Sequence, residues 1–307
     1  MTTVEDTEGP VQLGYDRLPL PVVAPAVLEA IARRHDLGSR PIRRQRWSGA
    51  MNSVYEIGDE HLLRVPLAIP QATRCIVEEA HVLPLLEHHG IDAPRLVAFD
   101  DARDLVDVPY TIYRRVHGES MDWWEVRHDR SPDLYRAIGA ELAKVHARVT
   151  AFPGDPDLLT TPTRTDPADL LAVARLPLPA RRWIERSLDH LRDVIDDHPA
   201  PRFLHADVRP GNTIVRDRRL AALIDWGSAG WGDPAIEFAA LWVWAVPHAL
   251  EGYRSVEPLD ENVEARIVWE HLIRVLALEG AIDLLRGVDW VVAARASAPD
   301  WMRPWLP

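Results

Sequence analysis

The sequence holds little of what builds secreted, disulfide-bonded or membrane proteins. It has one cysteine, Cys75, so an intramolecular disulfide cannot form and a cysteine-based zinc site is excluded. No apolar run reaches the roughly 18 residues that a membrane-spanning helix needs. The opening segment, MTTVEDTEGPVQ, is acidic and polar, unlike a secretory signal. We therefore expect a cytoplasmic protein with no membrane partner.

Basic residues are also scarce relative to acidic ones. Asp and Glu total 47 against 35 Lys and Arg, which gives a formal net charge of −12. Binding to nucleic acid through its phosphates needs the opposite sign, so we expect no nucleic-acid partner, whereas a negative field attracts cations. Lys144 is the only lysine among the 35 basic residues. A mechanism that needs a long cationic side chain elsewhere must use arginine, although genome composition also explains such a bias.

The first part of the chain predicts an arm followed by strands and helices. With 307 residues, of which 47 % are hydrophobic, the chain suits one large or two medium globular domains. Residues 1–24 are rich in proline and lack periodicity, which indicates an extended or mobile arm. From Pro25 the apolar positions Leu28 and Ile31 predict a short helix that Gly38 ends. Further apolar patterns predict strands over 42–47, 54–57, 61–66, 94–99 and 110–116, and a helix over 73–89.

The second part of the chain changes character after Gly118. Ser131 followed by Pro132 starts a predicted helix, because proline is well tolerated at the first helical position. Two β-branched runs predict a small hairpin at 213–215 and 220–224. Apolar spacing predicts the remaining helices at about 168–176, at about 179–197 and through most of 234–292.

These elements divide the chain into two expected lobes. Residues 25–116 combine a sheet with helices, and residues 117–307 are mainly helical with a small sheet insertion. We therefore expect an α+β, bilobal fold with an N-terminal β-sheet lobe and a mostly helical C-terminal lobe. A cleft is expected where the chain crosses between them, near residues 115–120.

The strongest chemical signal is the run FLHADVRPGNTIV followed by LIDWGSAGWGDP. Asp207 and Asn212 lie on one tight loop, and Asp225 ends the second strand of the hairpin. Phosphoryl transfer needs a base near the acceptor hydroxyl and oxygen ligands for Mg²⁺ on the nucleotide phosphates. Asp207 suits the base, and Asn212 and Asp225 suit the metal ion. Protein kinases show the same spacing in their motifs H-R-D-x4-N and D-F-G.

These motifs resemble the aminoglycoside phosphotransferase family, which includes antibiotic kinases, is related to choline kinase and has a protein-kinase-like fold. The family reads H-G-D-x4-N and then I-D-W or I-D-F, so Ala206 replaces the usual glycine. Over roughly residues 25–300, other segments resemble the family in order: SGAMNSVYEI its nucleotide loop, HLLRVP its third strand, EEAHVLPLLEHHGIDAPRLV its helix and next strand, and IYRRVHGESM its hinge. The resemblance gives Asp207, Asn212 and Asp225 the roles inferred above.

The resemblance further implies a binding place for ATP or GTP with Mg²⁺. Arg64 stands where the phosphate-binding lysine usually lies, and Arg can hold phosphate through two nitrogens. Glu79 is its expected ion-pair partner, with Glu78 as the alternative. Main-chain groups are expected to contact the phosphates or the purine at Ser48, Gly49, Asn52, Arg114 and Val116.

The acceptor pocket is implied to lie in the segment after the hinge and in the C-terminal helices. Tryptophans and carboxylates recur there; carboxylates pair with amines, and aromatic faces attract cations. We therefore expect a small cationic acceptor that carries a hydroxyl group. For Glu237 a structural tie to the catalytic loop is the alternative. The residues expected to contact the acceptor are Asp122, Trp123, Glu237, Trp242 and Glu270, and the same segments hold Trp124, Glu125, Trp244, Glu251 and Trp290.

Three functions fit this sequence. The first is a kinase that phosphorylates a hydroxyl of a cationic antibiotic, such as an aminoglycoside or a macrolide, with resistance as the outcome. The second is a metabolic kinase of choline, an amino alcohol or a sugar. The third is a kinase-fold binding protein without catalysis, against which the intact Asp207, Asn212 and Asp225 argue.

Overall fold

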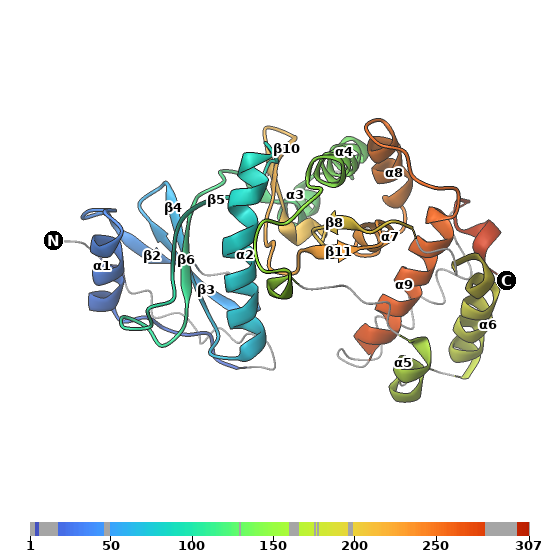
Figure 1. The fold of residues 1–307 in the computed structure, drawn as a ribbon, viewed down its shortest axis with the longest axis horizontal. Coiled ribbons are helices and arrows are strands. Elements are labelled where there is room, and N and C mark those ends of the chain that lie inside the picture. The colour runs from blue at the N-terminus through green and yellow to red at the C-terminus, as the bar shows by residue number, and fades with distance from the viewer. Residues whose placement is uncertain are drawn as a thin grey trace.

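The computed structural model describes residues 4–5, 18–45, 50–128, 130–159, 166–174, 176, 178–195, 199–279 and 300–306. Within them a sheet with two helices lies beside a larger group of helices and short strands (Figure 1). The expected α+β class, with a sheet-bearing N-terminal lobe and a mostly helical C-terminal lobe, is confirmed. The limits given above for the arm and the two lobes remain predictions.

The N-terminal lobe is built on a six-stranded sheet with the order β1-β2-β3-β4-β6-β5. β1 pairs with β2 in parallel, and all other neighbours are antiparallel. Sequence patterns predicted every strand except β1, which lies in the expected arm. The strands are β1 (Val4–Glu5), β2 (Ile42–Arg44), β3 (Asn52–Ile57), β4 (His61–Pro66), β5 (Arg95–Asp100) and β6 (Tyr110–Arg114).

The helix α1 (Pro25–Arg34) packs on one face of this sheet. Its predicted apolar residues Leu28 and Ile31 are buried in one cluster with Tyr55 and Ile57 of β3. Because side chains alternate along a strand, the residues between them on β3 face the opposite side of the sheet. One face of the sheet therefore packs against α1 in a hydrophobic core, and the opposite face is available for the functional site.

The end of the expected arm is fixed to the N-terminal lobe. Leu20 and Val23 are buried, and the carbonyl of Pro21 accepts a hydrogen bond of 2.5 Å from the hydroxyl of Ser53. Residues 6–17 of the arm lie outside the described part of the chain.

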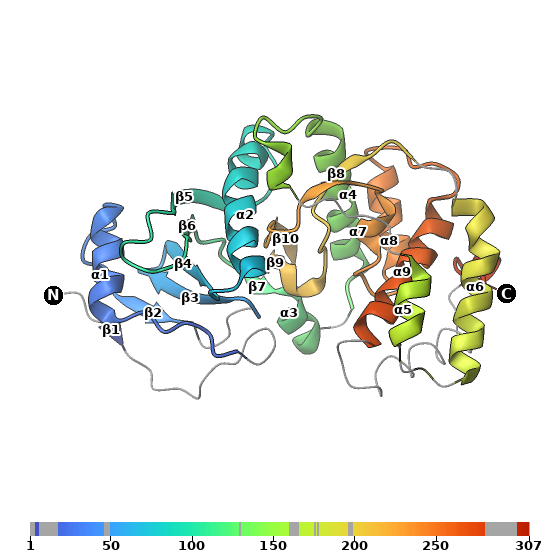
Figure 2. The ribbon, with the colours of Figure 1, turned by 60° about the horizontal axis from the view of Figure 1, so that its bottom comes forward.

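The helix α2 (Pro70–His88) stands between the sheet and the helical lobe (Figure 2). It begins three residues before the predicted start, with Pro70 in the first turn, where the missing N–H costs nothing. Its apolar residues Ile76, Leu83 and Leu86 are buried, and Leu83 and Leu86 share one cluster with Leu134 of the helical lobe. Because one core contains residues of both lobes, α2 ties them together.

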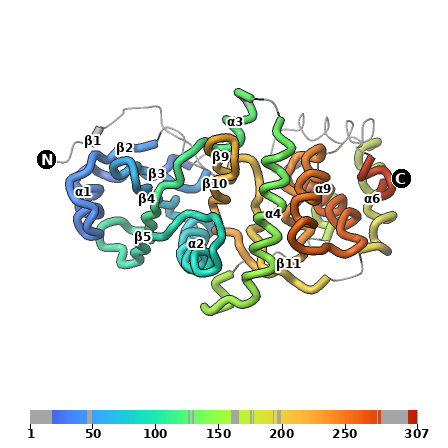
Figure 3. The backbone as a smooth tube through the Cα atoms, turned by 90° about the horizontal axis from the view of Figure 1, so that it is seen from above, coloured from blue at the N-terminus to red at the C-terminus, as the bar shows by residue number. Residues whose placement is uncertain are grey.

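The C-terminal lobe combines helices with two small sheets, ordered β10-β9-β7 and β11-β8. Figure 3 shows β9 and β10 between α2 and the helix α4. The predicted hairpin is present, and so are helices in the predicted helical segments as far as the described residues reach; residues 280–292 of the last segment lie outside them. The elements β7, α3, β8 and β11 were not predicted. The elements are β7 (Glu119–Ser120), α3 (Met121–Arg127), α4 (Pro132–Arg148), η2 (Pro156–Leu158), α5 (Pro167–Val173), α6 (Leu178–Ile195), β8 (Arg202–Leu204), η3 (Pro210–Asn212), β9 (Thr213–Arg216), β10 (Arg219–Leu223), β11 (Gly230–Gly232), α7 (Ala235–Phe238), α8 (Val246–Arg254), α9 (Val263–Glu279) and η4 (Arg303–Trp305).

Two helix contacts shape the C-terminal lobe. The helices α4 and α8 approach so closely that a Cβ atom on Gly139 of α4 would lie 1.8 Å from the carbonyl oxygen of Ala249 of α8. Farther from the sheet, α5, α6 and α9 form a separate buried cluster that includes Trp183, Leu272 and Met302. This second core holds α9 in place on the lobe. None of the described helices is both long and apolar enough to span a membrane.

Candidate active site

The loop between β8 and η3 carries the predicted base, and its backbone is unusual. Ala206 has φ 63°, in the left-handed region that glycine adopts without steric cost. This left-handed conformation explains why the resembling family usually has glycine where this chain has Ala206. The carboxylate of Glu237 holds the conformation here, because its two oxygens accept the backbone N–H groups of His205 at 2.6 Å and of Ala206 at 3.0 Å.

Glu237 therefore positions the catalytic loop, and the expectation that it contacts the acceptor is wrong. Its side chain is fully buried in α7, and both oxygens are engaged by the loop. The buried His146 of α4 lies 3.4 Å from one of these oxygens through Nε2, and its Nδ1 lies 2.7 Å from the hydroxyl of Tyr253. The structural alternative considered for Glu237 fits this arrangement.

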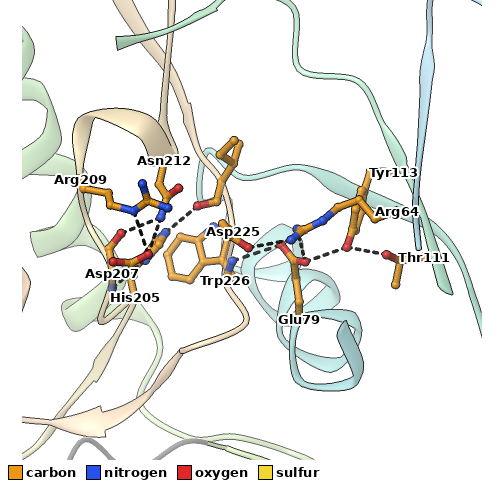
Figure 4. Close-up of polar contacts among 11 residues, drawn as sticks. Arg64, Glu79, Thr111, Tyr113, His205, Asp207, Arg209, Asn212, Asp225 and Trp226 are labelled. Carbon is orange, nitrogen blue, oxygen red and sulfur yellow. Dashed lines mark hydrogen bonds and ion pairs between the residues drawn. The ribbon is translucent and has the colours of Figure 1, made fainter. Parts of the chain in front are cut away.

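The carboxylate of Asp207 is surrounded by donors (Figure 4). Its Oδ2 accepts Nδ2 of Asn212 at 2.8 Å and Nε of Arg209 at 3.1 Å, and the same Nδ2 also donates to the Asp207 carbonyl at 2.9 Å. His205 accepts the Asp207 N–H through Nδ1, and its Nε2 lies 2.9 Å from the carbonyl of Ile224. His205 thus holds the backbone of this loop, with its proton on Nε2.

Asp225 lies next to this loop because the backbone N–H of Ile224 donates to the carbonyl of Asn212 at 2.9 Å. It adopts φ 69°, another left-handed conformation. Its Oδ1 accepts Nη2 of Arg64 at 2.8 Å. Although burial opposes its ionisation, the Arg64 guanidinium lowers the pKa of the Asp225 carboxyl below its usual value. The three residues predicted to carry the chemistry are therefore gathered at one place.

Arg64 of β4 pairs with one carboxylate of its own lobe and with one of the C-terminal lobe. Its Nη1 donates to Oε2 of Glu79 on α2 at 2.6 Å, and its Nη2 reaches Asp225. Glu79 is thus the ion-pair partner, as expected, and the alternative Glu78 lies 3.9 Å from Arg74 instead. Although burial works against the charge, Glu79 and Asp225 raise the pKa of Arg64, so it stays cationic.

Two further groups contact Glu79 and fix its orientation. The hydroxyl of Tyr113 donates to Oε2 at 2.7 Å and itself accepts from Thr111 at 2.6 Å. The backbone N–H of Trp226 donates to Oε1 at 3.1 Å. Sequence reasoning missed this role of Tyr113, which lies in the segment IYRRVHGESM that resembles the hinge. Arg64 therefore rests on a carboxylate that cannot turn freely.

The residues expected to contact the nucleotide through their main chain differ in where the structure places them. Ser48 and Gly49 lie outside the described residues. Asn52 begins β3 and is buried, with its Oδ1 unpaired. Arg114 is paired with strands on both sides, so its backbone lies inside the sheet, which argues against the expected purine contact. Val116 lies beyond β6, in the segment that leaves the sheet, and stays a prediction.

On the acceptor side, α3 lies against the catalytic loop. A Cβ atom on Gly211 would lie 2.7 Å from Oδ2 of Asp122 and 3.0 Å from Nη1 of Arg209, so both side chains end close to the backbone of η3. Trp123 on the same helix and Trp242 after α7 are both more than half exposed, at 55 % and 54 %. Asp122 therefore joins the catalytic loop, and the two tryptophans leave faces open to a ligand.

A second carboxylate on α3 was noticed only in passing from the sequence. Glu125 accepts the hydroxyl of Tyr135 at 2.9 Å and a hydrogen bond from Trp242. Burial raises its pKa, and nearby Asp122 raises it further. The edge of Trp244 meets Tyr135, and the guanidinium of Arg130 stacks 4.9 Å from the Trp244 ring. The guanidinium of Arg130 thus already contacts this cluster of aromatic and acidic side chains.

The remaining acceptor-side candidates are spread along the C-terminal helices. Glu270 is partly exposed on α9, the helix that also brings Arg274 to the site. Trp124 is buried and stacks on His128. Glu251 pairs with Arg136 on the outer side of α8. Trp290 lies outside the described residues.

The oxygen atoms present suit Mg²⁺ held jointly with a nucleotide. Asn212 uses its Nδ2 toward Asp207, so its Oδ1 is the amide atom that suits a metal ion, and Asp225 adds a carboxylate. Among the described residues no three His, Cys, Asp or Glu side chains gather as a metal site. Mg²⁺ takes oxygen ligands and shares them with phosphates and water, and the amide of Asn212 and the carboxylate of Asp225 are oxygen ligands of this kind.

Two arginines beside Asp207 were also missed by sequence reasoning. Arg209 follows Asp207 by two residues, so its proximity was readable from the motif itself. Arg274 comes from α9, and its Nη2 lies 3.7 Å from Oδ1 of Asp207. No sequence pattern marks Arg274, because only the packing of α9 brings it here.

Comparison with known proteins assigns the chain to a family. Residues 43–266 match the model of the phosphotransferase enzyme family. Thiamine kinase of Escherichia coli O17:K52:H18 (strain UMN026 / ExPEC) is 32 % identical over 168 residues, which cover 50 % of this chain and 56 % of that protein. The chain thus spans about half the length of the curated relatives it matches.

Solved structures share the fold at low sequence identity. The GDP complex of an aminoglycoside 2′-phosphotransferase mutant superposes with a TM-score of 0.65 at 18 % identity and covers 88 % of this chain and 97 % of that one. A choline/ethanolamine kinase family protein from Mesorhizobium loti gives a TM-score of 0.61 at 18 % identity, with 91 % and 98 % covered. This likeness confirms the kinase-like fold expected from the motifs.

Proposed function

Because the chain belongs to the phosphotransferase enzyme family, we propose that it transfers the terminal phosphoryl group of ATP or GTP to a hydroxyl of a small cationic molecule. The observation that carries this proposal is the convergence of Asp207, Asn212 and Asp225 beside the Arg64–Glu79 ion pair. A kinase of this type needs few protein groups beyond these, since positioning and charge stabilisation supply most of the catalysis.

In the proposed reaction Asp207 orients the acceptor hydroxyl and takes its proton. The hydrogen bonds from Asn212 and Arg209 hold Oδ2 in place, which leaves Oδ1 as the oxygen for the proton. Asn212 and Asp225 would hold Mg²⁺, which when bound neutralises phosphate charge. Arg64 would contact the nucleotide phosphates, since a guanidinium fork matches phosphate geometry.

The acceptor is proposed to be cationic because of what surrounds the catalytic loop on its α3 side. Asp122 and Glu125 stand one turn apart on α3, and Trp242 borders them with more than half of its surface exposed. Arg130 already places a guanidinium over Trp244 in the same cluster. An ammonium group of a substrate would find the same carboxylates and aromatic faces.

Two classes of acceptor compete. The first is a hydroxylated cationic antibiotic, an aminoglycoside or a macrolide, where the added phosphate would introduce charge and bulk and abolish drug action. The second is a metabolic alcohol such as choline, an amino alcohol or a sugar; the curated thiamine kinases favour this class, since thiamine joins a positive charge to a hydroxyl.

The test is a product assay with a broad acceptor panel. The protein is incubated with Mg²⁺ and ATP or GTP and with aminoglycosides, macrolides, choline, thiamine and sugars, and phosphorylated products are measured by mass spectrometry. Asp207→Asn should lower the rate of phosphoryl transfer about 10²- to 10⁴-fold, which is the usual contribution of a general base. Asp189→Asn, at an exposed aspartate of α6, is the matched control and should keep full activity.

The outcomes separate the candidate functions. Faster turnover of an antibiotic supports the first class, and faster turnover of choline, thiamine or a sugar supports the second. Absence of any phosphorylated product, together with absence of Mg²⁺-dependent nucleotide binding, would overturn catalysis in favour of a binding protein. Normal turnover by Asp207→Asn would remove Asp207 from the role of base.

A further inference from the structure

We propose that Arg274 of α9, together with Arg209 of the catalytic loop, contacts the phosphoryl group as it is transferred. This inference rests on the proposed function. It assigns a catalytic role to a helix that the motifs do not reach, since the motif residues all lie before α7.

The first observation is that each arginine lies near a different carboxylate oxygen of Asp207. Arg209 reaches Oδ2 of Asp207 at 3.1 Å through Nε, whereas Nη2 of Arg274 stands 3.7 Å from Oδ1. The second contact is an ion pair that is too long for a hydrogen bond. Oδ1 therefore keeps its position for the acceptor hydroxyl, and Arg274 lies next to the place where that hydroxyl must sit.

The second observation concerns reach and exposure. The side chains of Arg209 and Arg274 are 45 % and 39 % exposed, so neither guanidinium is locked inside the core. Arg209 donates to Asp207 through Nε, one of its five N–H donors. Its two terminal Nη nitrogens form a fork whose geometry matches a phosphate. The backbones that carry them are fixed, because η3 follows a loop held by Glu237 and α9 is anchored in the second core.

The third observation is the distribution of charge. The chain has a net charge of −12, yet Arg64, Arg209 and Arg274 all contact the carboxylates of the site. A nucleotide triphosphate brings several negative charges, and charge spreads over the phosphoryl oxygens during transfer. Three guanidiniums in an acidic protein, gathered where these oxygens must lie, meet that requirement without a lysine.

The chemical step then balances as follows. A new bond forms between the acceptor oxygen and the γ-phosphorus while the bond from that phosphorus to the β,γ-bridging oxygen breaks. The electron pair of the broken bond stays on the nucleoside diphosphate, and the acceptor proton passes to Oδ1 of Asp207. Protonation removes the charge that Arg274 faces, and the phosphoryl oxygens replace it as the partner of both arginines.

The test needs no knowledge of the acceptor. Calorimetry with Mg²⁺ compares the affinity of a triphosphate analogue, AMP-PNP or GMP-PNP, with that of ADP or GDP. Arg274→Gln should weaken the triphosphate analogue about tenfold, the order of one hydrogen bond between charged groups, and change the diphosphate less than about twofold. Arg274→Lys, which keeps the charge but loses the fork, should fall between Gln and the unaltered protein.

Arg254→Ala is the matched control, because Arg254 of α8 has a similar exposure of 41 % and pairs with Glu264 away from the base. It should change neither affinity. An unchanged ratio of triphosphate to diphosphate affinity in both Arg274 variants would overturn the proposal, as would an equal loss of both nucleotides. If the unaltered protein binds neither nucleotide, the proposed function itself fails, which is a different result.

Discussion

Asp225 is the residue whose environment a bound metal must change most. It pairs with Arg64 at 2.8 Å and adopts a left-handed backbone conformation next to the carbonyl of Asn212. A metal ion at this carboxylate competes with the guanidinium for the same negative charge. If Asp225 holds Mg²⁺ as proposed, metal binding is expected to free Arg64 to contact phosphate.

Asp225→Asn should separate these two effects. With Mg²⁺ present, nucleotide affinity should fall at least about tenfold. Loss of a residue that only hydrogen-bonds to a metal ligand already lowers metal affinity by about this factor, and Asp225 is proposed to be a ligand itself. Without Mg²⁺ it should stay equal or rise, because Arg64 is released toward the phosphates. Calorimetry with and without Mg²⁺ measures both, and Asp101→Asn, an exposed aspartate paired with Arg103, is the control. An unchanged affinity in Mg²⁺ would remove Asp225 from the ligand set.

Glu125 predicts a pH dependence of acceptor binding. Burial and Asp122 raise its pKa, so as the pH falls it takes up a proton before an ordinary glutamate does and loses the charge that attracts a cation. The groups that face it are Tyr135, Trp242, Asp122 and Arg130. The KM for a cationic acceptor should therefore rise on acidification from about pH 8 to about pH 5, ahead of an ordinary carboxylate.

The control for this pH effect is the neutral variant. Glu125→Gln should show a high KM at all pH values and should lose the acid-side rise. Glu87→Gln, at a half-exposed glutamate of α2 that pairs with Arg95, should keep the original profile. Identical profiles for Glu125→Gln and the unaltered protein would contradict a contact between Glu125 and the acceptor.

Residues of the site were predictable when their partners are near in sequence. Asp207 and Asn212 share one loop, so their spacing alone brings them together, and Asp225 follows in the same hairpin. Tyr113 and Arg274 were not predictable, because β6 and α9 supply them through tertiary packing. Glu237 was misassigned because a sequence shows an acidic residue but not which of its neighbours is a backbone N–H group.

At the scale of elements, length decided what could be predicted. Long amphipathic segments such as α1, α2 and α4 repeat their apolar pattern often enough to be recognised. The strands β7, β8 and β11 have two or three residues each, too few for an alternation to show. These short strands nevertheless place α3 and the catalytic loop, so the missed elements are the ones that shape the acceptor side.

The contact between α4 and α8 gives a stability prediction of defined sign. Helix propensity alone predicts that Gly139→Ala stabilises the protein by about 1 kcal/mol. The added methyl would instead meet the backbone oxygen of Ala249 at 1.8 Å, and overpacking of this kind costs about 1–3 kcal/mol or more. Urea unfolding should therefore show a loss of stability.

The matched control for this contact lies on the same helix. Ala147 is exposed on α4, so Ala147→Leu adds more bulk without a clash and should change stability by less than about 0.5 kcal/mol. Stabilisation by Gly139→Ala would show that α8 can move away and that the two helices are not held at this distance.

For the whole molecule, the decisive feature is that α2 shares its core with the helical lobe. Leu83 and Leu86 of α2 join the same buried cluster as Leu134 and Ile138 of α4, while the opposite face of the sheet has its own core. Arg64 adds an ion pair across the lobes. Two lobes connected in this way are expected to unfold together.

Calorimetry should show one unfolding transition, and Mg²⁺ with nucleotide should move it upward as a whole. A ligand at 100 times its dissociation constant stabilises the folded state by about 2.7 kcal/mol, which corresponds to a few degrees for a chain of this size. Two resolved transitions, of which nucleotide moves only one, would contradict a common core and show that the lobes unfold independently.

The guanidinium at position 64 also determines which reagents can attack the site. Acyl-phosphate nucleotides and pyridoxal phosphate label enzymes by reacting with an amine, and the only lysine, Lys144, is on α4, where it pairs with Glu141. Such probes have no lysine to attach to beside Glu79 and Asp225. Dicarbonyl reagents such as phenylglyoxal, which react with guanidinium groups, are instead the covalent inhibitors to which this protein is open, and bound nucleotide should shield it from them.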